Sequence, residues 1–398
     1  MQKGSEDDTI EKLLEHYDEL SDHIKVETKD SDLYPKFTSQ YTDQTVAANS
    51  VIVVCGDKSK VVSNSDMWET STNYQTYQTQ TTGFDGEGQI TSAITYVTSE
   101  NNPKVYWVTG HGEASESDLS TNFSDAVNKN NVEISDLALM TDDIPEDAEE
   151  LVIMSPTTDF SEDEANKVIT YLENGGKLLM FTSYTGTDMP NLDSILENYG
   201  VKRSSGIVVE TDSQHYYPQM PYYLLPNIQS DDITTEVKSN YILMPVAQAI
   251  QKLDSYRDTI TIKSLLTTTE DAYIENDPEN STWSKSADSE TGAFDLGVSI
   301  TETVDDKETQ IIYFSSASML SSQIDQAISG ANSKLAATAL TSMCDVEQTV
   351  VIPSKSTSYT NLVFTQGAVN TWSIITIAGI PLVLVVIGVM IWMKRRKQ

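Results

Sequence analysis

An uncharged apolar run near the C-terminus constrains this chain more than any other feature. The run extends from Trp372 to Met393, a length of 22 residues. A helix needs about 20 residues to cross a hydrocarbon core of about 30 Å. Membrane helices tolerate a residue such as Pro381, and Trp372 and Trp392 at the two ends suit the membrane interfaces. The run therefore predicts one transmembrane helix over residues 372–393.

The basic residues that follow this run indicate its direction. They are Lys394, Arg395, Arg396 and Lys397. Because positively charged flanks stay on the cytoplasmic side, we expect residues 394–398 to form a cytoplasmic tail. The rest of the chain is then extracytoplasmic and is held at the cell membrane by a single span.

The part of the chain before the helix is strongly acidic, with 60 acidic residues, 21 basic residues and a net charge of −39. Such a surface repels nucleic acid and anionic lipid, so we expect no nucleic-acid partner. The same charge excess is also explained by solubility alone. No run has the spacing of an EF-hand loop, and the chain has only four histidines. We therefore expect no metal and no cofactor.

Cysteine content and the first residues add two expectations. Cys55 and Cys344 are the only cysteines and can form at most one disulfide, so stability must come from a packed core. The first eight residues are polar and no secretory signal follows. We expect either that translocation depends on the C-terminal helix or that the natural chain begins further upstream.

The first hundred residues predict a small α/β domain, residues 1–100. Apolar residues three and four apart predict a helix over 9–20, and a strand is expected at 24–27. The run SVIVVC, followed by Gly56-Asp57, predicts a hairpin of strands 50–55 and 60–62. Residues 71–83 are rich in Thr and Gln and indicate a loop or an exposed edge. A helix over 90–97 ends near Pro103, a candidate boundary.

The next segment predicts a larger α/β domain, residues 101–350. Strands are expected at 105–109, 132–137, 151–154 and 177–181, with a helix at 119–128. Ser161 and Glu164 form the pattern of a capping box before an apolar helical face, so the segment 151–181 is a βαβ unit. Two such units in series predict a doubly wound, mostly parallel sheet with helices on both faces. Its ligand crevice is expected at the carboxyl ends of the strands.

The remaining elements extend this domain to the membrane. A helix is expected at 192–199, and strands at 207–209, 242–244, 259–262, 296–300 and 310–314, the last two as a hairpin. Residues 215–226 and 275–292 are expected to be loops. A juxtamembrane stalk, residues 351–371, is expected to contain strands near 350–352 and 362–364.

The loop Gly110-His111-Gly112-Glu113 is the main concentration of polar groups at a predicted strand end. Glycine lets a ligand approach the backbone, and histidine titrates near neutrality. The loop is therefore a candidate to bind a ligand or partner. Alternatively, the glycines serve a tight turn and His111 holds the following helix or a neighbouring loop.

A second candidate is a tyrosine-rich stretch of four residues, Tyr216, Tyr217, Tyr222 and Tyr223. Tyrosine gives broad contact at low entropic cost, so the stretch is a candidate surface for sugars or protein. Simple packing of a loop explains it equally well.

Three segments, with the single terminal span, resemble the auxiliary component of gliding-motility-type ABC transporters. They are YWVTGHGE at 106–113, IPEDAEELVIMSP at 144–156 and DFSEDEANKVITYLENGGKLLMF at 159–181. The resemblance begins at SDHIKVETKD, residues 21–30. It implies an external domain related in fold to class I glutamine amidotransferases, preceded by a thioredoxin-like domain. It also implies two partners, an ABC ATPase and an ABC-2-type permease. The family usually has a second transmembrane segment near its N-terminus, which this sequence lacks.

The residues argue against catalysis. An amidotransferase needs a cysteine nucleophile at a strand-to-helix turn beside a histidine, but Ser155-Pro156-Thr157 stands at the comparable place. The sequence has no G-x-S-x-G near a histidine, no C-x-x-C and no G-x-x-x-x-G-K-[ST]. We therefore expect a non-enzymatic accessory subunit of an ABC transporter that binds or presents substrate or braces the permease. The alternatives are a membrane-anchored surface hydrolase or amidase, and a stand-alone structural or adhesive surface protein.

Overall fold

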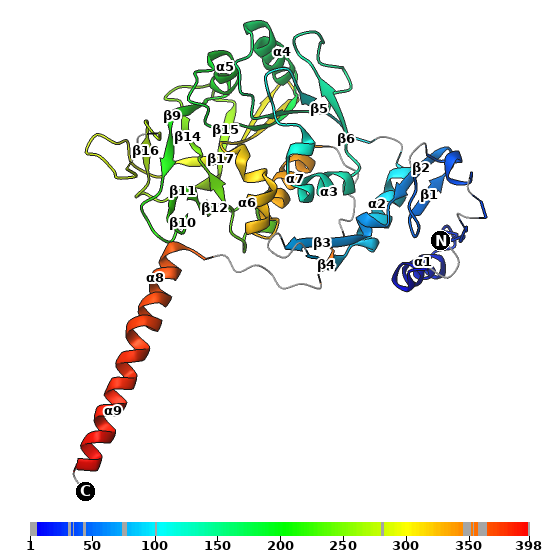
Figure 1. Cartoon of the computed structure of the whole chain (residues 1–398). Helices are drawn as coiled ribbons and strands as arrows, with labels where there is room; N and C mark the ends of the chain where they lie inside the picture. The colour runs from blue at the N-terminus through cyan, green and yellow to red at the C-terminus, as the bar shows by residue number, and fades with distance from the viewer. Residues whose placement is uncertain are drawn as a thin grey trace. The chain divides into compact units, whose positions relative to one another are not determined.

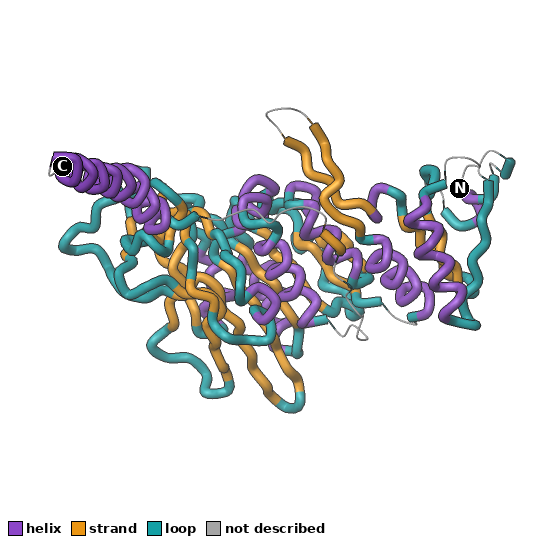
Figure 2. Tube along the Cα trace, turned by 90° about the horizontal axis from the view of Figure 1, so that it is seen from below, coloured by secondary structure: helices purple, strands orange, loops and turns teal. Residues whose placement is uncertain are grey.

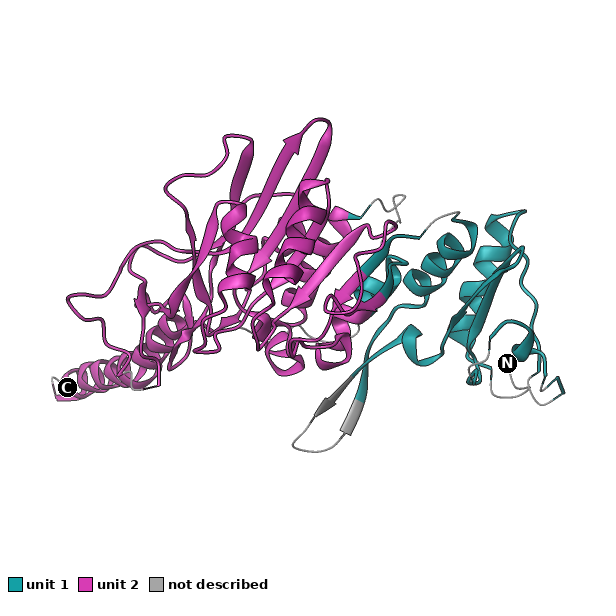
Figure 3. Ribbon diagram, turned by 90° about the horizontal axis from the view of Figure 1, so that it is seen from above, with its two compact units in different colours: residues 1–105, 125–134, 344–360 teal, residues 106–124, 135–343, 361–398 magenta. Residues whose placement is uncertain are grey.

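A computed structural model describes residues 6–30, 33–34, 36–42, 45–73, 78–99, 102–279, 282–344, 352, 354–356 and 364–396. The chain divides into two compact units (Figure 3). Unit 1 contains residues 1–105, 125–134 and 344–360, and unit 2 contains residues 106–124, 135–343 and 361–398.

Unit 1 packs two helices against short antiparallel strands. Its elements are α1 (Asp8–Leu20), β1 (Val51–Cys55), β2 (Lys58–Val62), β3 (Trp68–Asn73), β4 (Gln78–Phe84), α2 (Gly86–Thr98) and β19 (Lys355–Ser356). Asp7 caps α1 by accepting hydrogen bonds from the amides of Thr9 and Ile10. The apolar core is small and includes Ile10, Met67 and Ile90.

The predicted helices and the first hairpin of unit 1 are confirmed, whereas the strand at 24–27 is wrong. Residues 24–30 form no ladder with β1, and β1 pairs with β2. An alternating pattern makes a strand only when a neighbouring edge accepts its backbone hydrogen bonds. Residues 71–83 were expected to form either a loop or an exposed edge. The described residues among them form strands, and β3 lies at the edge of the sheet β19-β4-β3. Threonine suits a pleated strand even where aliphatic residues are few.

Unit 2 is an α/β domain around a large sheet (Figure 1). The strand order is β16-β9-β14-β17-β18-β8-β7-β5-β6, and β15 pairs with β17 and β12. These strands are β5 (Lys104–Val108), β6 (Glu133–Leu137), β7 (Glu150–Met154), β8 (Lys177–Phe181), β9 (Val201–Val209), β12 (Asn227–Ile228), β14 (Gln248–Lys252), β15 (Ile260–Thr267), β16 (Tyr273–Glu275), β17 (Asp295–Val304) and β18 (Lys307–Phe314).

Parallel strands form the centre of the sheet, as the sequence predicts. β8 pairs in parallel with β7 on one side and with β18 on the other. The predicted hairpin of β17 and β18 is also confirmed, with Val304 opposite Lys307. Beyond β17 the sheet continues with antiparallel pairs through β14, β9 and β16. The α/β fold is therefore confirmed, and the structure adds this antiparallel extension.

Helices cover both faces of the sheet (Figures 1 and 2). They are α4 (Glu162–Glu173), α5 (Pro190–Asn198), α6 (Ser322–Ala327) and α7 (Ala331–Met343), whereas α3 (Thr121–Lys129) is divided between the two units. Leu151 and Ile153 pack in one core with α4 and α5, and Val152 between them is equally buried. Because side chains alternate along a strand, this burial requires cover on both faces.

The segment 215–226, expected to be a loop, contains the hairpin of β10 (Tyr216–Tyr217) and β11 (Met220–Leu224). β11 also pairs with β13 (Met244–Pro245). Tyrosine favours strands, whereas Pro218 lies in the turn and Pro221 lies at the irregular register. The prolines thus occupy positions where no ladder hydrogen bond is lost.

The helix that contains the uncharged run, called the anchor helix after its expected role, begins earlier than the run. It consists of α8 (Gln366–Ile374), a π-helical turn (Ile375–Gly379) and α9 (Ile380–Arg396). Thr365 caps its N-terminus by accepting a hydrogen bond from the amide of Ala368. The wide turn precedes Pro381, which cannot donate a helical hydrogen bond. The strands expected near 350–352 and 362–364 lie almost wholly outside the described residues.

Candidate functional site

The loop Gly110–Glu113 follows β5, next to the carboxyl end of β7 in the sheet order. Gly110 and Gly112 have φ values of 124° and 76°, where glycine is favoured. A Cβ on Gly112 would overlap the hydroxyl of Thr157, in the loop after β7. Glycine is therefore required at position 112 for these two loops to approach each other.

His111 lies buried between two carboxylates. Its side chain is 5% exposed, Nδ1 lies 3.4 Å from Oε1 of Glu113, and Nε2 lies 3.3 Å from Oε2 of Glu164. The ring also packs on Phe160, with centroids 4.4 Å apart. Nδ1 and Oε1 of Glu113 lie close together but form no hydrogen bond, so this contact is one of proximity and charge alone.

Glu164 links this cluster to helix α4. Its Oε2 accepts hydrogen bonds from the amide (2.9 Å) and hydroxyl (2.6 Å) of Ser161, which completes the capping box. Burial alone would raise the pKa of Glu164. The hydrogen bonds from Ser161 and the nearby His111 outweigh that effect, so the pKa lies below its ordinary value.

The backbone of the same loop also forms hydrogen bonds with neighbouring residues. The carbonyl of His111 accepts hydrogen bonds from the amides of Thr157 (2.8 Å) and Thr158 (3.1 Å). The amide of His111 donates to Oε2 of Glu113 at 2.7 Å. These contacts match the alternative in which His111 holds a neighbouring loop, while Gly110 and Gly112 are exposed.

The end of β7 carries a serine in an unusual backbone conformation. Ser155 has a φ of 54°, and its hydroxyl donates to that of Ser183 at 2.8 Å. The described contacts of the His111 ring are with Glu113, Glu164 and Phe160. Ser155 and His111 therefore show no nucleophile–base contact of the kind that catalysis requires.

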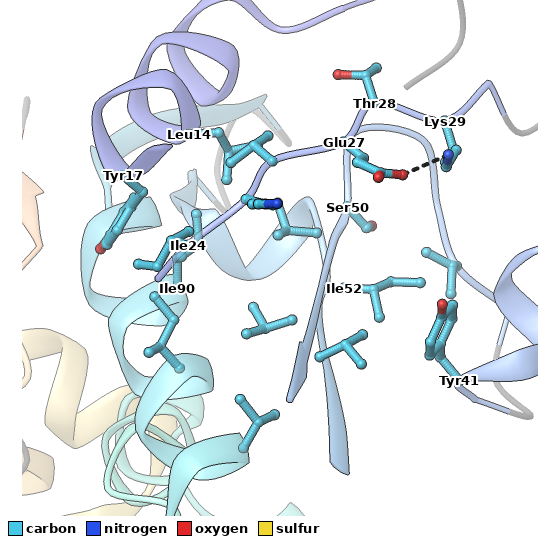
Figure 4. A pocket seen from close by; sticks show the side chains of 18 of the residues that line it. Leu14, Tyr17, Ile24, Glu27, Thr28, Lys29, Tyr41, Ser50, Ile52 and Ile90 are labelled. Carbon is cyan, nitrogen blue, oxygen red and sulfur yellow. Dashed lines mark ion pairs between the residues drawn. The ribbon is translucent and has the colours of Figure 1, made fainter. Parts of the chain in front are cut away.

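Unit 1 contains a cavity of about 590 Å³ for which the sequence carries no local signal (Figure 4). It is lined by Leu14 and Tyr17 of α1, Ile90 of α2, Ile52 of β1 and residues 21 and 23–30. Its volume lies within the usual range for ligand pockets. Residues 24–27, which were expected to form a strand, line this cavity instead.

The other predicted residues lie apart from the His111 cluster. Trp372 and Trp392 are exposed along the anchor helix, and the guanidinium of Arg396 lies 5.2 Å from the ring centroid of Trp392. Lys394, Arg395 and Arg396 form the last turn. Cys55 and Cys344 are not bonded to each other. Within the described ranges, no group of three or more His, Cys, Asp or Glu side chains could hold a metal.

In the sequence, Glu164 shows only the pattern of a helix-capping residue. Its contact with His111 joins positions more than fifty residues apart, and only the adjacency of β5 and β7 brings them together. Thr157 and Thr158 were missed for the same reason. The sequence carries no local signal for these contacts.

The fold and site define an α/β protein that ends in a helix long and apolar enough to cross a membrane, Gln366–Arg396. The chain belongs to the family described as an ABC-type uncharacterized transport system, whose model matches residues 102–342. The resemblance to an auxiliary component of ABC transporters is confirmed at this level. No curated protein matches the chain.

Three solved structures are similar to parts of this chain. The mmIFT52 N-terminal domain is 15% identical, with 60% of this chain and 96% of that chain covered and a TM-score of 0.44. A putative ThuA-like protein from Parabacteroides merdae is 12% identical, with 67% and 99% covered and a TM-score of 0.33. The exo-β-1,4-mannosidase Op5Man5 from Opitutaceae bacterium strain TAV5 is 11% identical, with 64% and 37% covered and a TM-score of 0.31. Similarity at this level supports no inference about function.

Proposed function

We propose that this chain is a non-catalytic, extracytoplasmic accessory subunit of an ABC transporter of the gliding-motility type. The observation that carries the proposal is the family match over residues 102–342. Its partners are an ABC ATPase and an ABC-2-type permease. Because the sequence has no phosphate-binding G-x-x-x-x-G-K-[ST] motif, the energy for transport comes from the ATPase.

In this proposal, two parts of the chain contact other molecules. The helix over residues 372–393 contacts the permease within the membrane. The loop Gly110–Glu113 contacts a ligand or partner through its exposed glycine backbone. The buried contacts of His111 with Glu113 and Glu164 support this role, because they hold the loop in one shape. The substrate is bound or presented by the external units, or these units brace the permease.

The decisive experiment is purification of the full-length tagged protein from its native membrane in mild detergent, with co-purifying chains identified by mass spectrometry. We expect an ABC ATPase and a polytopic permease at near-equal abundance. Recovery of the protein alone, from a preparation that preserves known complexes, would overturn the proposal and favour a stand-alone surface protein.

Two variants refine this test. Replacing residues 372–393 with a leucine-rich span of equal length keeps the anchor and removes its specific surface, so we expect the permease to be lost. His111→Ala is expected to reduce transport, with the exposed His16 as the matched control in His16→Ala. Intact transport in a folded His111→Ala protein would remove the loop from the mechanism.

A further inference from the structure

The hairpin of β10 and β11 is attached to the start of the anchor helix. The amide of Gly367 donates to the carbonyl of Ser213 at 2.7 Å, and the amide of Gln219 donates to Oε1 of Gln366 at 3.0 Å. The hydroxyl of Thr365 donates to Oε1 of Gln214 at 3.1 Å. Thr365 is 5% exposed, so these contacts seat the helix start against the hairpin, as Figure 1 shows.

This attachment places the hairpin close to the membrane. The uncharged run begins at Trp372, five residues beyond Gly367. At 1.5 Å per residue these two positions are about 7.5 Å apart along the helix axis. The polar headgroup layer on each side of the hydrocarbon core is roughly 5–7 Å thick. With Trp372 at the boundary of the hydrocarbon core, the base of the hairpin lies at the outer edge of the headgroup layer.

The charge distribution favours the same position. The chain has a net charge of −35, yet residues 213–230 contain no Asp, Glu, Lys or Arg. Residues 356–393 are also free of these four types. Carboxylates close to a membrane would be repelled by anionic headgroups and would lose hydration. Both segments that lie nearest the membrane therefore contain no charged side chain.

The side chains of the hairpin are those that favour a membrane interface. The tyrosines at 216, 217, 222 and 223 are all partly exposed, and Tyr222 packs on Trp283 with centroids 4.4 Å apart. Met220 is 38% exposed in the hairpin, and Phe364, just before the helix cap, is 49% exposed. Tyrosine and tryptophan are enriched at headgroup level because their rings are apolar and their tips are polar.

We propose that the β10–β11 hairpin, together with Phe364, lies in the headgroup layer and holds unit 2 against the lipid surface. The inference rests on the proposed membrane anchoring. It assigns the tyrosine-rich stretch to phospholipid rather than to a sugar or a protein. The anchor helix supplies attachment to the membrane, and the hairpin supplies a second contact that limits tilting of the unit about the helix start.

The test uses site-directed spin labels on the full-length protein in phosphatidylcholine nanodiscs without any partner. In a background with both cysteines replaced by alanine, single cysteines are placed at three positions. Met220→Cys reports on the hairpin, and Val385→Cys reports on the middle of the anchor helix. Met140→Cys is the matched control, because Met140 is 70% exposed in the loop after β6. Only labelled variants whose melting temperature equals that of the unlabelled protein are compared.

Accessibility to a water-soluble nickel chelate is then compared with accessibility to oxygen. We expect the accessibility of the label at 220 to the chelate to be roughly one third, or less, of that of the label at 140. The reason is that the chelate is excluded near the headgroup–acyl boundary. Equal accessibility at 220 and 140, with 385 protected, would overturn the hairpin inference alone. Exposure of 385 to the chelate would overturn the anchor itself. Protection of 220 only after a permease is added would assign the surface to protein and also overturn the inference.

Discussion

Replacing Glu164 with glutamine tests whether His111 is held by a buried charge contact. The substitution keeps the shape of the side chain and an acceptor for the Ser161 amide, but it removes the charge 3.3 Å from Nε2 of His111. Removing a buried carboxylate that accepts hydrogen bonds leaves its donors unpaired, which costs about 1–3 kcal/mol. We expect the upper end of this range, about 3 kcal/mol of unfolding free energy, because Oε2 of Glu164 accepts two hydrogen bonds from Ser161 and also faces His111.

Thermal unfolding of the full-length protein in detergent, followed by tryptophan fluorescence, measures this effect. Trp107 is a natural reporter, since its indole donates to the carbonyl of Ala114 directly after the loop. For a domain of this size, about 3 kcal/mol lowers the melting temperature by about 6–12 °C. Glu162→Gln is the matched control, because Glu162 is exposed in the same helical turn and its loss costs at most about 1 kcal/mol.

The pH dependence of stability is a second test of the contribution of the Glu164 carboxylate. The pKa of Glu164 is lower in the folded protein than its ordinary value. Its contribution to stability is therefore complete above the unfolded pKa, about 4.3, and is lost as the pH falls through the folded pKa. We expect the gap in melting temperature between wild type and Glu164→Gln to be constant from pH 7 to about pH 5 and to shrink below it. A gap near zero at pH 7, or one that grows on acidification, would refute the argument.

Three further substitutions probe contacts of unit 2. Gly112→Ala places a Cβ against Thr157 at a φ of 76° and should lower stability by about 1–3 kcal/mol, measured by melting temperature. Gly367→Val forces the helix start away from Gln214 and should increase proteolytic cleavage near the helix cap. The carboxylate of Asp325 is fully buried and accepts hydrogen bonds from the hydroxyls of Ser120 and Ser333. Asp325→Ala leaves these donors unpaired and should lower the free energy of unfolding by about 3 kcal/mol or more.

Each of these has an informative control. Alanine or valine at Gly388 meets no atom within 4 Å and should leave both melting and proteolysis unchanged. For the buried carboxylate, Asp325→Asn keeps one acceptor oxygen and should cost less than Asp325→Ala. Wild-type melting or cleavage in the three test variants would show that the contacts are not required.

The sequence alone determined the elements whose signals are local. The capping box at Ser161 and Glu164, with an apolar helical face after it, specified α4 because a helix satisfies its first amides from adjacent residues. The uncharged run at 372–393 predicted a membrane-spanning helix because its length is set by the hydrocarbon thickness. The resemblance identified the class of transporter component that the family match then confirmed.

The tertiary structure decided the contacts between distant residues. Residues 24–27 have a strand pattern, but pairing depends on a partner edge, and a cavity lies beside β1 instead. Glycine and histidine in the loop 110–113 fitted either a ligand site or a brace. The structure shows that the His111 ring contacts Glu164 and that the His111 carbonyl accepts a hydrogen bond from the amide of Thr157. The physical reason is that helices and caps are closed by neighbours in sequence, whereas sheet edges, buried charges and membrane-facing surfaces are defined by residues brought together by the fold.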